Sequence, residues 1–194
     1  MRGSEAAESA IGVFFTPLEW TKWVVNRYGL FEQWVHGATV FDPTAGEGNF
    51  LEAFIAIARE RNIPVRRDML ERLFGIEKEE RYVAKFFLKM KEQYHLAFPL
   101  RNFQCEDFIL SNYDLRADIL VGNPPWQNFN DLPQGYKRRV KPHFVRHHLA
   151  PRPQDLLLGS SRIDLAALVI AKSLTHHLKN DGSAFFFLPL LSSE

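Results

Sequence analysis

Apolar residues along the chain recur at two different spacings. Short, largely apolar runs predict buried strands, because a strand that is covered on both faces has no side for water. These runs cover residues 38–41, 73–76, 102–105, 118–122 and 183–188. Between them, apolar residues three or four positions apart predict helices over residues 18–34, 49–61, 80–94 and 163–178. This alternation predicts an α/β domain with a central, mostly parallel sheet and helices on both faces.

Polar side chains stand at or just after the carboxyl ends of four predicted strands. They are Asp42, Glu77, Asp107 and Asn123. In a parallel sheet these strand ends meet at one edge, and ligands of such sheets bind there. The sequence therefore predicts one ligand site to which four strands contribute.

Composition changes this picture in only a few respects. The net charge is +1, so contact with a polyanion requires a local basic patch rather than an overall positive charge. Cys105 is the single cysteine, which excludes an internal disulfide and fits a reducing cytoplasm, where we expect the protein to be located. No apolar stretch approaches the roughly 20 residues of a membrane span, and the N-terminus has no apolar signal core.

The segment after the first strand, residues 42–48, reads DPTAGEG. Gly46 and Gly48 allow a tight turn that brings backbone N–H groups close to a ligand at the start of a helix. An ordinary strand-to-helix turn is the alternative interpretation. A dinucleotide site would have a third glycine where Leu51 stands. Asp42, ahead of the glycines, suits a cationic ligand better than a pyrophosphate.

The other strand ends extend this site. Glu77 is placed to hold two ribose hydroxyls with the two oxygens of its carboxylate. Asp107 can accept a hydrogen bond from an adenine amino group, and Phe108 can lie on the purine face. Together with Asp42, these residues predict a pocket for a nucleoside that carries a cationic amino-acid tail.

Residues 123–126 read NPPW and follow an apolar strand. A proline-stiffened turn is the alternative interpretation. The Asn123 side-chain oxygen and the Pro124 carbonyl can accept both hydrogens of one amino group. Two such acceptors favour a pyramidal nitrogen with a localised lone pair, which stabilises a transition state more than the ground state. Pro125 helps to fix the backbone, and Trp126 offers a flat face on which a base can stack.

Residues 127–162 are rich in proline, glycine, histidine and basic side chains and are predicted as a long basic loop. The loop either approaches phosphates or is solvated and partly disordered, and the sequence leaves both interpretations open. His147-His148 and His176-His177 do not predict a metal site, because adjacent residues rarely point at one ion. Asp164 is either structural or part of the target pocket.

These motifs resemble those of the N6-adenine-specific DNA methyltransferases of restriction-modification systems. Phe15-Thr16-Pro17 matches the family's leading segment, and residues 42–50 (DPTAGEGNF) match its cofactor loop. Residues 123–126 match its catalytic tetrapeptide, although Tyr or Phe is commoner than Trp126 at the last position. The resemblance covers residues 12–191. It implies a Rossmann-like S-adenosylmethionine-dependent methyltransferase fold.

The resemblance also implies a role for each matched residue. Phe15, Thr16 and Pro17 would close over the methionine end of S-adenosylmethionine, and Asp42 would face its ammonium group. Glu77 would hold the ribose, and Asp107 the adenine, with Phe108 packed on the ring. The remaining cofactor-binding residues would be Pro43, Ala45, Gly46, Gly48, Asn49, Phe50 and Asn123. Asn123, Pro124, Pro125 and Trp126 would act on a target adenine that swings out of duplex DNA.

Full domains of this family have about seven strands, of which this sequence predicts five. We therefore expect a flexible tail over residues 1–11, a catalytic domain over 12–194 truncated at its C-terminus, and no target-recognition domain. Further domains or subunits would then read the DNA sequence. RNA adenine, DNA cytosine N4 and protein glutamine remain alternative substrates, and a cofactor-binding fragment without activity is a further alternative. No membrane contact is expected.

Overall fold

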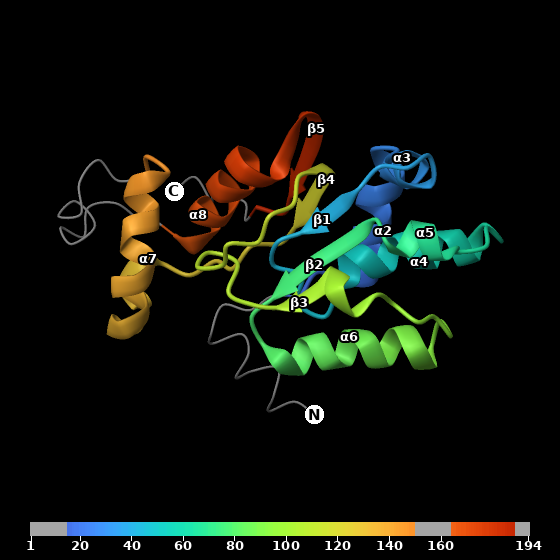
Figure 1. Ribbon diagram of the computed structural model, residues 1–194, viewed down its shortest axis with the longest axis horizontal. Coiled ribbons are helices and arrows are strands. Elements are labelled where there is room, and N and C mark those ends of the chain that lie inside the picture. The colour runs from blue at the N-terminus through green and yellow to red at the C-terminus, as the bar shows by residue number, and fades with distance from the viewer. Residues whose placement is uncertain (1–14, 150–163, 189–194) are drawn as a thin grey trace, which may run out of the picture.

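Five parallel strands form the centre of the molecule (Figure 1). The computed structural model describes residues 15–149 and 164–188. The strands are β1 (Val40–Asp42), β2 (Leu73–Glu77), β3 (Phe103–Cys105), β4 (Ala117–Gly122) and β5 (Leu178–Phe186), in the order β3-β2-β1-β4-β5. Every pairing is parallel, which confirms the predicted sheet. The chain order reverses at β1, and the crevice beside such a strand is where ligands bind.

Helices cover both faces of this sheet. The helices are α2 (Leu18–Arg27), α3 (Leu30–Val35), α4 (Asn49–Glu60), α5 (Arg67–Leu70), α6 (Glu80–Glu92), α7 (Gln134–Arg146) and α8 (Leu165–Lys172). Short 3₁₀ turns span Leu100–Asn102 and Phe129–Asp131, and a π-helical turn spans Ser173–His177. In Figure 1, α7 and α8 lie on the opposite side of the molecule from α2, α3, α4 and α5. Among the described residues, no helix is long and apolar enough to cross a membrane.

Two hydrophobic clusters account for this layering. Successive side chains of a strand point to opposite faces, so Val40 joins the cluster under α2, α3, α4 and α6, whereas Phe41 joins the cluster under α7 and α8. On β4, Ile119 and Val121 likewise belong to the first cluster and Leu120 to the second. Because both faces of the sheet are covered, its strands must be apolar on both faces, and the apolar runs in the sequence predict this arrangement.

The predicted helix over residues 18–34 is two helices. Gly29 has a φ of 64°, in the left-handed region that ends a helix, and it separates α2 from α3. The apolar spacing continues across this break because both helices pack on one core, through Val24 and Val25 on α2 and Trp34 on α3. A helix pattern alone therefore does not reveal the break.

The predicted basic loop contains a helix, which corrects the prediction for the part of residues 127–162 that the structure describes. Helix α7 carries Tyr136, Val140 and Phe144 four residues apart, and Val140 and Phe144 are fully buried. This apolar stripe packs the helix on Phe129 and joins it to the hydrophobic cluster that also contains the buried residues of α8. Frequent basic residues conceal the stripe in the sequence. The predicted tail 1–11 and residues 150–162 lie outside the described residues.

Candidate cofactor and catalytic site

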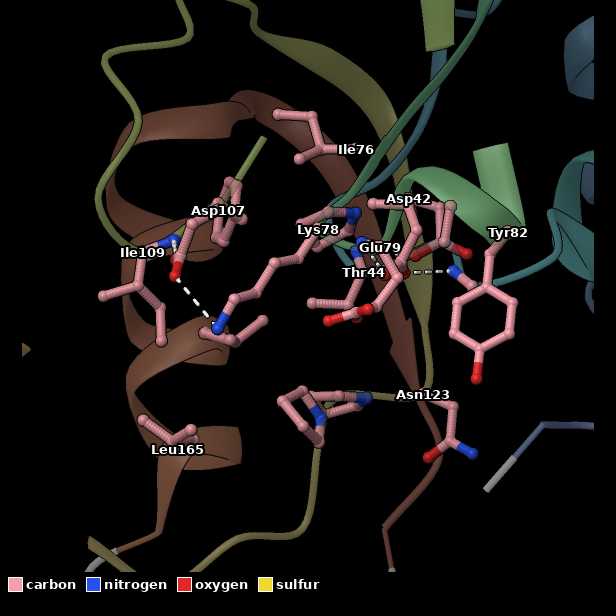
Figure 2. A pocket seen from close by; sticks show the side chains of 18 of the residues that line it. Asp42, Thr44, Ile76, Lys78, Glu79, Tyr82, Asp107, Ile109, Asn123 and Leu165 are labelled. Atoms are coloured by element: carbon pink, nitrogen blue, oxygen red, sulfur yellow. Dashed lines mark hydrogen bonds and ion pairs between the residues drawn. The ribbon is translucent and has the colours of Figure 1, made fainter. Parts of the chain in front are cut away.

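The carboxyl ends of β1, β2 and β4 and the turn after β3 surround one cavity (Figure 2). The predicted site residues that line it are Phe15, Thr16, Asp42, Pro43, Ala45, Gly46, Asn49, Phe50, Glu77, Asp107, Phe108, Asn123, Pro124 and Pro125. Pro17, Gly48 and Trp126 do not line it. The structure thus brings the DPTAGEG segment and most of the NPPW segment to one place, although 74 residues lie between them.

The two glycines of the first segment are required by close packing. Gly46 has a φ of 56° and Gly48 a φ of 77°, both in the left-handed region. A Cβ on Gly48 would lie 2.2 Å from the Phe86 ring, and one on Gly46 would lie 2.9 Å from the Phe15 ring. Any other residue would therefore displace one of these rings as well as strain the turn.

Residues 15–17 are tied to the glycine-rich turn through Asn49. The Asn49 side-chain amide donates to the Thr16 carbonyl over 2.9 Å, and the Phe15 ring packs edge-on against Tyr82 with centroids 4.8 Å apart. The buried Thr16 hydroxyl has no hydrogen-bond partner among the described residues, and neither has the buried Thr44 hydroxyl. Unpartnered buried hydroxyls in a cavity wall suit a polar ligand.

Asp42 is a buried carboxylate at the end of β1. Its side chain is only 2% exposed, and one oxygen accepts a hydrogen bond from the Thr44 backbone N–H over 3.0 Å. Within the described ranges, no lysine, arginine or histidine forms an ion pair with it. Burial, with a smaller contribution from the charge of Glu77, raises the pKa of Asp42 to about 8. A ligand cation at this position would remove the cost of the buried charge.

Glu77, at the end of β2, connects two turns. One carboxylate oxygen accepts from the Gly46 N–H and the other from the Glu79 N–H, each over 2.8 Å. Burial raises the pKa of this carboxyl group. Because each carboxylate oxygen has a second lone pair, both oxygens can still accept a hydrogen bond from a hydroxyl group of a ligand.

Asp107 already has protein partners. One of its oxygens accepts from the Ile109 N–H over 3.1 Å, and the other lies 3.7 Å from the Lys78 ammonium, which reaches across the cavity in Figure 2. The same ammonium lies 4.2 Å from the centre of the Tyr136 ring. Burial, followed by the negative charge of Asp107, raises the pKa of the Tyr136 hydroxyl. This end of the cavity is therefore electrostatically balanced by the chain itself.

Asn123 follows β4 and faces the same cavity. Its side-chain oxygen accepts a hydrogen bond from the Trp126 indole N–H over 3.1 Å. Trp126 thus contacts the Asn123 amide, whereas the sequence predicted only a flat face for stacking.

Sequence reasoning missed several lining residues. Lys78 and Glu79 follow Glu77 directly, and this position next to a strand end was a usable signal. Tyr136 had no such signal, because it reaches the cavity from α7, where a loop was predicted. Asp164 does not line the cavity; it caps α8 by accepting from the Ala167 N–H over 2.8 Å.

Comparison with known proteins places this geometry in context. No protein-family model matches the chain. It is 26% identical over 187 residues to the type II methyltransferase M.NspV of Nostoc sp. (strain ATCC 29411 / PCC 7524), covering 92% of this chain and 35% of that protein. It is 24% identical over 191 residues to the type II methyltransferase M.CvrRI of Paramecium bursaria Chlorella virus XZ-6E, covering 97% of this chain and 39% of that protein. The chain thus spans well under half the length of these relatives.

Solved structures agree on the fold. A Listeria monocytogenes protein assigned as a class I S-adenosylmethionine-dependent methyltransferase aligns with a TM-score of 0.54 at 13% identity, covering 86% of this chain and 45% of that one. The methyltransferase subunit of a type I restriction-modification system from Streptococcus thermophilus aligns with a TM-score of 0.52 at 16% identity, covering 88% of this chain and 33% of that one. The Rossmann-like methyltransferase fold is thereby confirmed, and the sequence similarity identifies the chain as a relative of restriction-modification methyltransferases.

Proposed function

We propose that the chain transfers a methyl group from S-adenosylmethionine to the exocyclic N6 amino group of adenine in DNA, within a restriction-modification or related phage-defence system. The observation that carries the proposal is the cavity shared by Asp42, at the end of β1, and Asn123, just after the adjacent strand β4. A carboxylate that has no cationic partner among the described residues and an asparagine amide thus line one cavity. The first suits a cationic donor, and the second suits an amine acceptor.

The cavity has the chemistry that S-adenosylmethionine requires. Asp42 would accept from the ammonium group, and the hydroxyls of Thr16 and Thr44 are available to its amino-acid end. Glu77 would accept from the ribose hydroxyls and Asp107 from the adenine amino group, as the sequence predicted. When it is bound, S-adenosylmethionine supplies an electrophilic methyl group, and the protein supplies position and hydrogen bonding.

The chain's own contribution to the reaction would come from Asn123 and Pro124. Their two oxygens would accept the hydrogens of the target amine, so that its lone pair is localised on nitrogen. The Asn123 oxygen has a second lone pair beside the one that the Trp126 indole uses. Because Trp126 does not line the cavity in this structure, stacking of its ring on the target adenine would require the indole to rotate.

The whole protein's organisation is part of this proposal. Residues 12–194 would form the catalytic domain, and segments or subunits beyond this chain would complete the sheet and read the DNA sequence. The target adenine would leave the duplex to reach Asn123, at the usual cost of a few kcal/mol for unstacking a base.

The decisive experiment measures label transfer from tritiated S-adenosylmethionine to duplex DNA, to RNA and to protein in parallel. We expect label in duplex DNA, recovered as N6-methyladenine after digestion to nucleosides. Label in RNA, in cytosine or in protein would contradict the proposed substrate. Cofactor binding in calorimetry without any transfer would make the isolated chain a cofactor-binding fragment.

A matched pair of variants tests the catalytic role. Asn123→Ala should abolish transfer and leave cofactor affinity nearly unchanged. Asn112→Ala, an exposed asparagine that does not line the cavity, should change neither quantity. Full transfer by Asn123→Ala would remove Asn123 from the mechanism.

A further inference from the structure

Helix α7 differs from the rest of the chain in how its basic residues are paired. Elsewhere in the described residues, most lysines and arginines form ion pairs with carboxylates; the lysines that do so are Lys22, Lys78, Lys85, Lys89 and Lys179, and the arginines are Arg61, Arg66, Arg67, Arg72 and Arg101. Helix α7 contains Lys137, Arg138, Arg139, Lys141 and Arg146 and no acidic residue. In the part of the chain that the structure describes, none of these five forms an ion pair. Since the net charge is only +1, unbalanced positive charge is concentrated on this helix.

The orientation of α7 is set by its apolar stripe. Val140 and Phe144 are fully buried, which directs the opposite side of the helix to solvent. Arg138, Arg139 and Arg146 are exposed on that side. These three residues define the outer face of α7.

The outer face belongs to a helix that borders the candidate active site. Tyr136 lines the cavity and lies on the same helix, two residues before Arg138. Residues two apart lie about 200° apart around a helix, so Arg138 points away from the side that Tyr136 occupies. At about 1.5 Å per residue, the segment from Tyr136 to Arg146 extends roughly 15 Å along the helix axis. A duplex strand advances about 3.4 Å per nucleotide, so this length corresponds to roughly four phosphates.

We propose that the outer face of α7 docks the sugar–phosphate backbone of duplex DNA beside the base that enters the cavity. This inference rests on the proposed function for the identity of the nucleic acid. Guanidinium groups bind phosphate oxygens with paired hydrogen bonds, and such contacts position a duplex without reading its sequence. The charge of the helix is complementary to a polyanion, and the same helix lines the cavity through Tyr136.

The test compares two triple variants that each remove three positive charges. One changes the outer face of α7, beside the carboxyl ends of the strands, and the other changes arginines near their amino ends. Arg138→Gln/Arg139→Gln/Arg146→Gln neutralises the outer face of α7. Arg66→Gln/Arg67→Gln/Arg101→Gln neutralises three exposed arginines at and near the amino ends of β2 and β3, far from the cavity. The probe is a 30-base-pair duplex of mixed sequence, whose dissociation constant is measured over a series of salt concentrations.

We expect the α7 variant to bind the duplex more weakly. The slope of its log affinity against log salt should also decrease by about 0.9 for each phosphate that the helix no longer neutralises. The control variant should keep the wild-type slope. An α7 variant with the wild-type slope, equal losses of affinity in both variants, or a wild-type chain that does not bind the duplex at low salt would overturn the proposal.

A second measurement separates this inference from the proposed function. Both triple variants should bind S-adenosylhomocysteine in calorimetry as the wild-type chain does, because none of the six arginines lines the cavity. Methyl transfer to DNA with an unchanged salt slope in the α7 variant would refute the docking surface and leave the function standing. A reduced slope in a chain that methylates nothing would support the docking surface and refute the function.

Discussion

The carboxylates at the two ends of the cavity, Asp42 and Asp107, differ in their electrostatic partners. At the end of β1, Asp42 is buried, and no basic group in the described ranges pairs with it. At the turn after β3, Asp107 is 17% exposed, lies 3.7 Å from the Lys78 ammonium and has Tyr136 beside it. Within the described part of the chain, Asp42 has no counter-charge, whereas Asp107 has one in Lys78.

This difference indicates where binding energy is concentrated. A cationic ligand at Asp42 favours the ionised form of a carboxyl group whose pKa is about 8 in the free protein, and it makes with that form a buried, charge-assisted contact worth about 1.5–3 kcal/mol. A ligand at Asp107 exchanges one set of partners for another, and the gain of such an exchange is small. We therefore expect the Asp42 end to determine affinity and the Asp107 end to adjust it.

The largest effect is expected for Asp42→Asn, which keeps the shape of the side chain and removes its charge. Affinity for S-adenosylmethionine in titration calorimetry should fall by about tenfold or more, since each 1.4 kcal/mol is a factor of ten. The control is Asp114→Asn, at an exposed aspartate outside the cavity. Unchanged affinity in Asp42→Asn would mean that the cationic end of the ligand lies elsewhere.

The same substitution should stabilise the free protein at alkaline pH. The folded pKa of Asp42, about 8, lies above the ordinary value of the unfolded chain, so its stability contribution is present at low pH and is lost as pH rises through 8. The melting temperature of Asp42→Asn relative to wild type should therefore increase from pH 5 to pH 8.5. The free-energy difference grows by up to about 1.4 kcal/mol per pH unit. Thermal melts without cofactor measure this difference in stability. A difference in melting temperature that does not change with pH would contradict a buried, titrating Asp42.

The sequence predicted the central strands well because burial on both faces leaves few alternatives, whereas β5 begins at Leu178, five residues before its predicted start, in a stretch with exposed residues. The expected strands 73–76 and 118–122 correspond to β2 and β4 within one residue at either end. The break at Gly29 and the helix α7 were missed for different reasons. At Gly29 two helices share one core and so continue one apolar pattern, whereas in α7 basic residues outnumber the apolar stripe that holds the helix in place.

The sequence could predict those site residues that stand at or just after the carboxyl end of a strand. Asp42, Glu77 and Asn123 are of this kind, because strand direction alone brings them to one edge. Tyr136 and Trp126 are not. Tyr136 reaches the cavity because α7 packs on the hydrophobic cluster that it shares with α8, and Trp126 is held by a hydrogen bond within a local turn.

A smaller effect is expected at the second carboxylate. Asp107→Asn keeps one acceptor oxygen and loses only a charge that Lys78 already offsets. Affinity for S-adenosylmethionine should fall by about two- to fivefold, as for a partly exposed ion pair worth up to about 1 kcal/mol. Calorimetry beside Asp42→Asn makes the comparison direct, and a loss at Asp107 that equals the loss at Asp42 would show that the two ends do not differ.

The smallest effect is expected for Tyr136→Phe, which removes a hydroxyl and keeps the ring under the Lys78 ammonium. Because phenylalanine keeps the ring of this lining residue, and Asp107 keeps the Ile109 N–H and the Lys78 ammonium as partners, cofactor affinity should change by less than about twofold, below the value of one typical hydrogen bond. Tyr136→Ala removes the wall as well and should weaken binding further. If Tyr136→Phe weakens binding as much as Asp107→Asn does, the hydroxyl is an essential partner of that carboxylate. The Asp107 end would then depend on the position of α7, and cofactor binding would be coupled to the helix that carries the basic outer face.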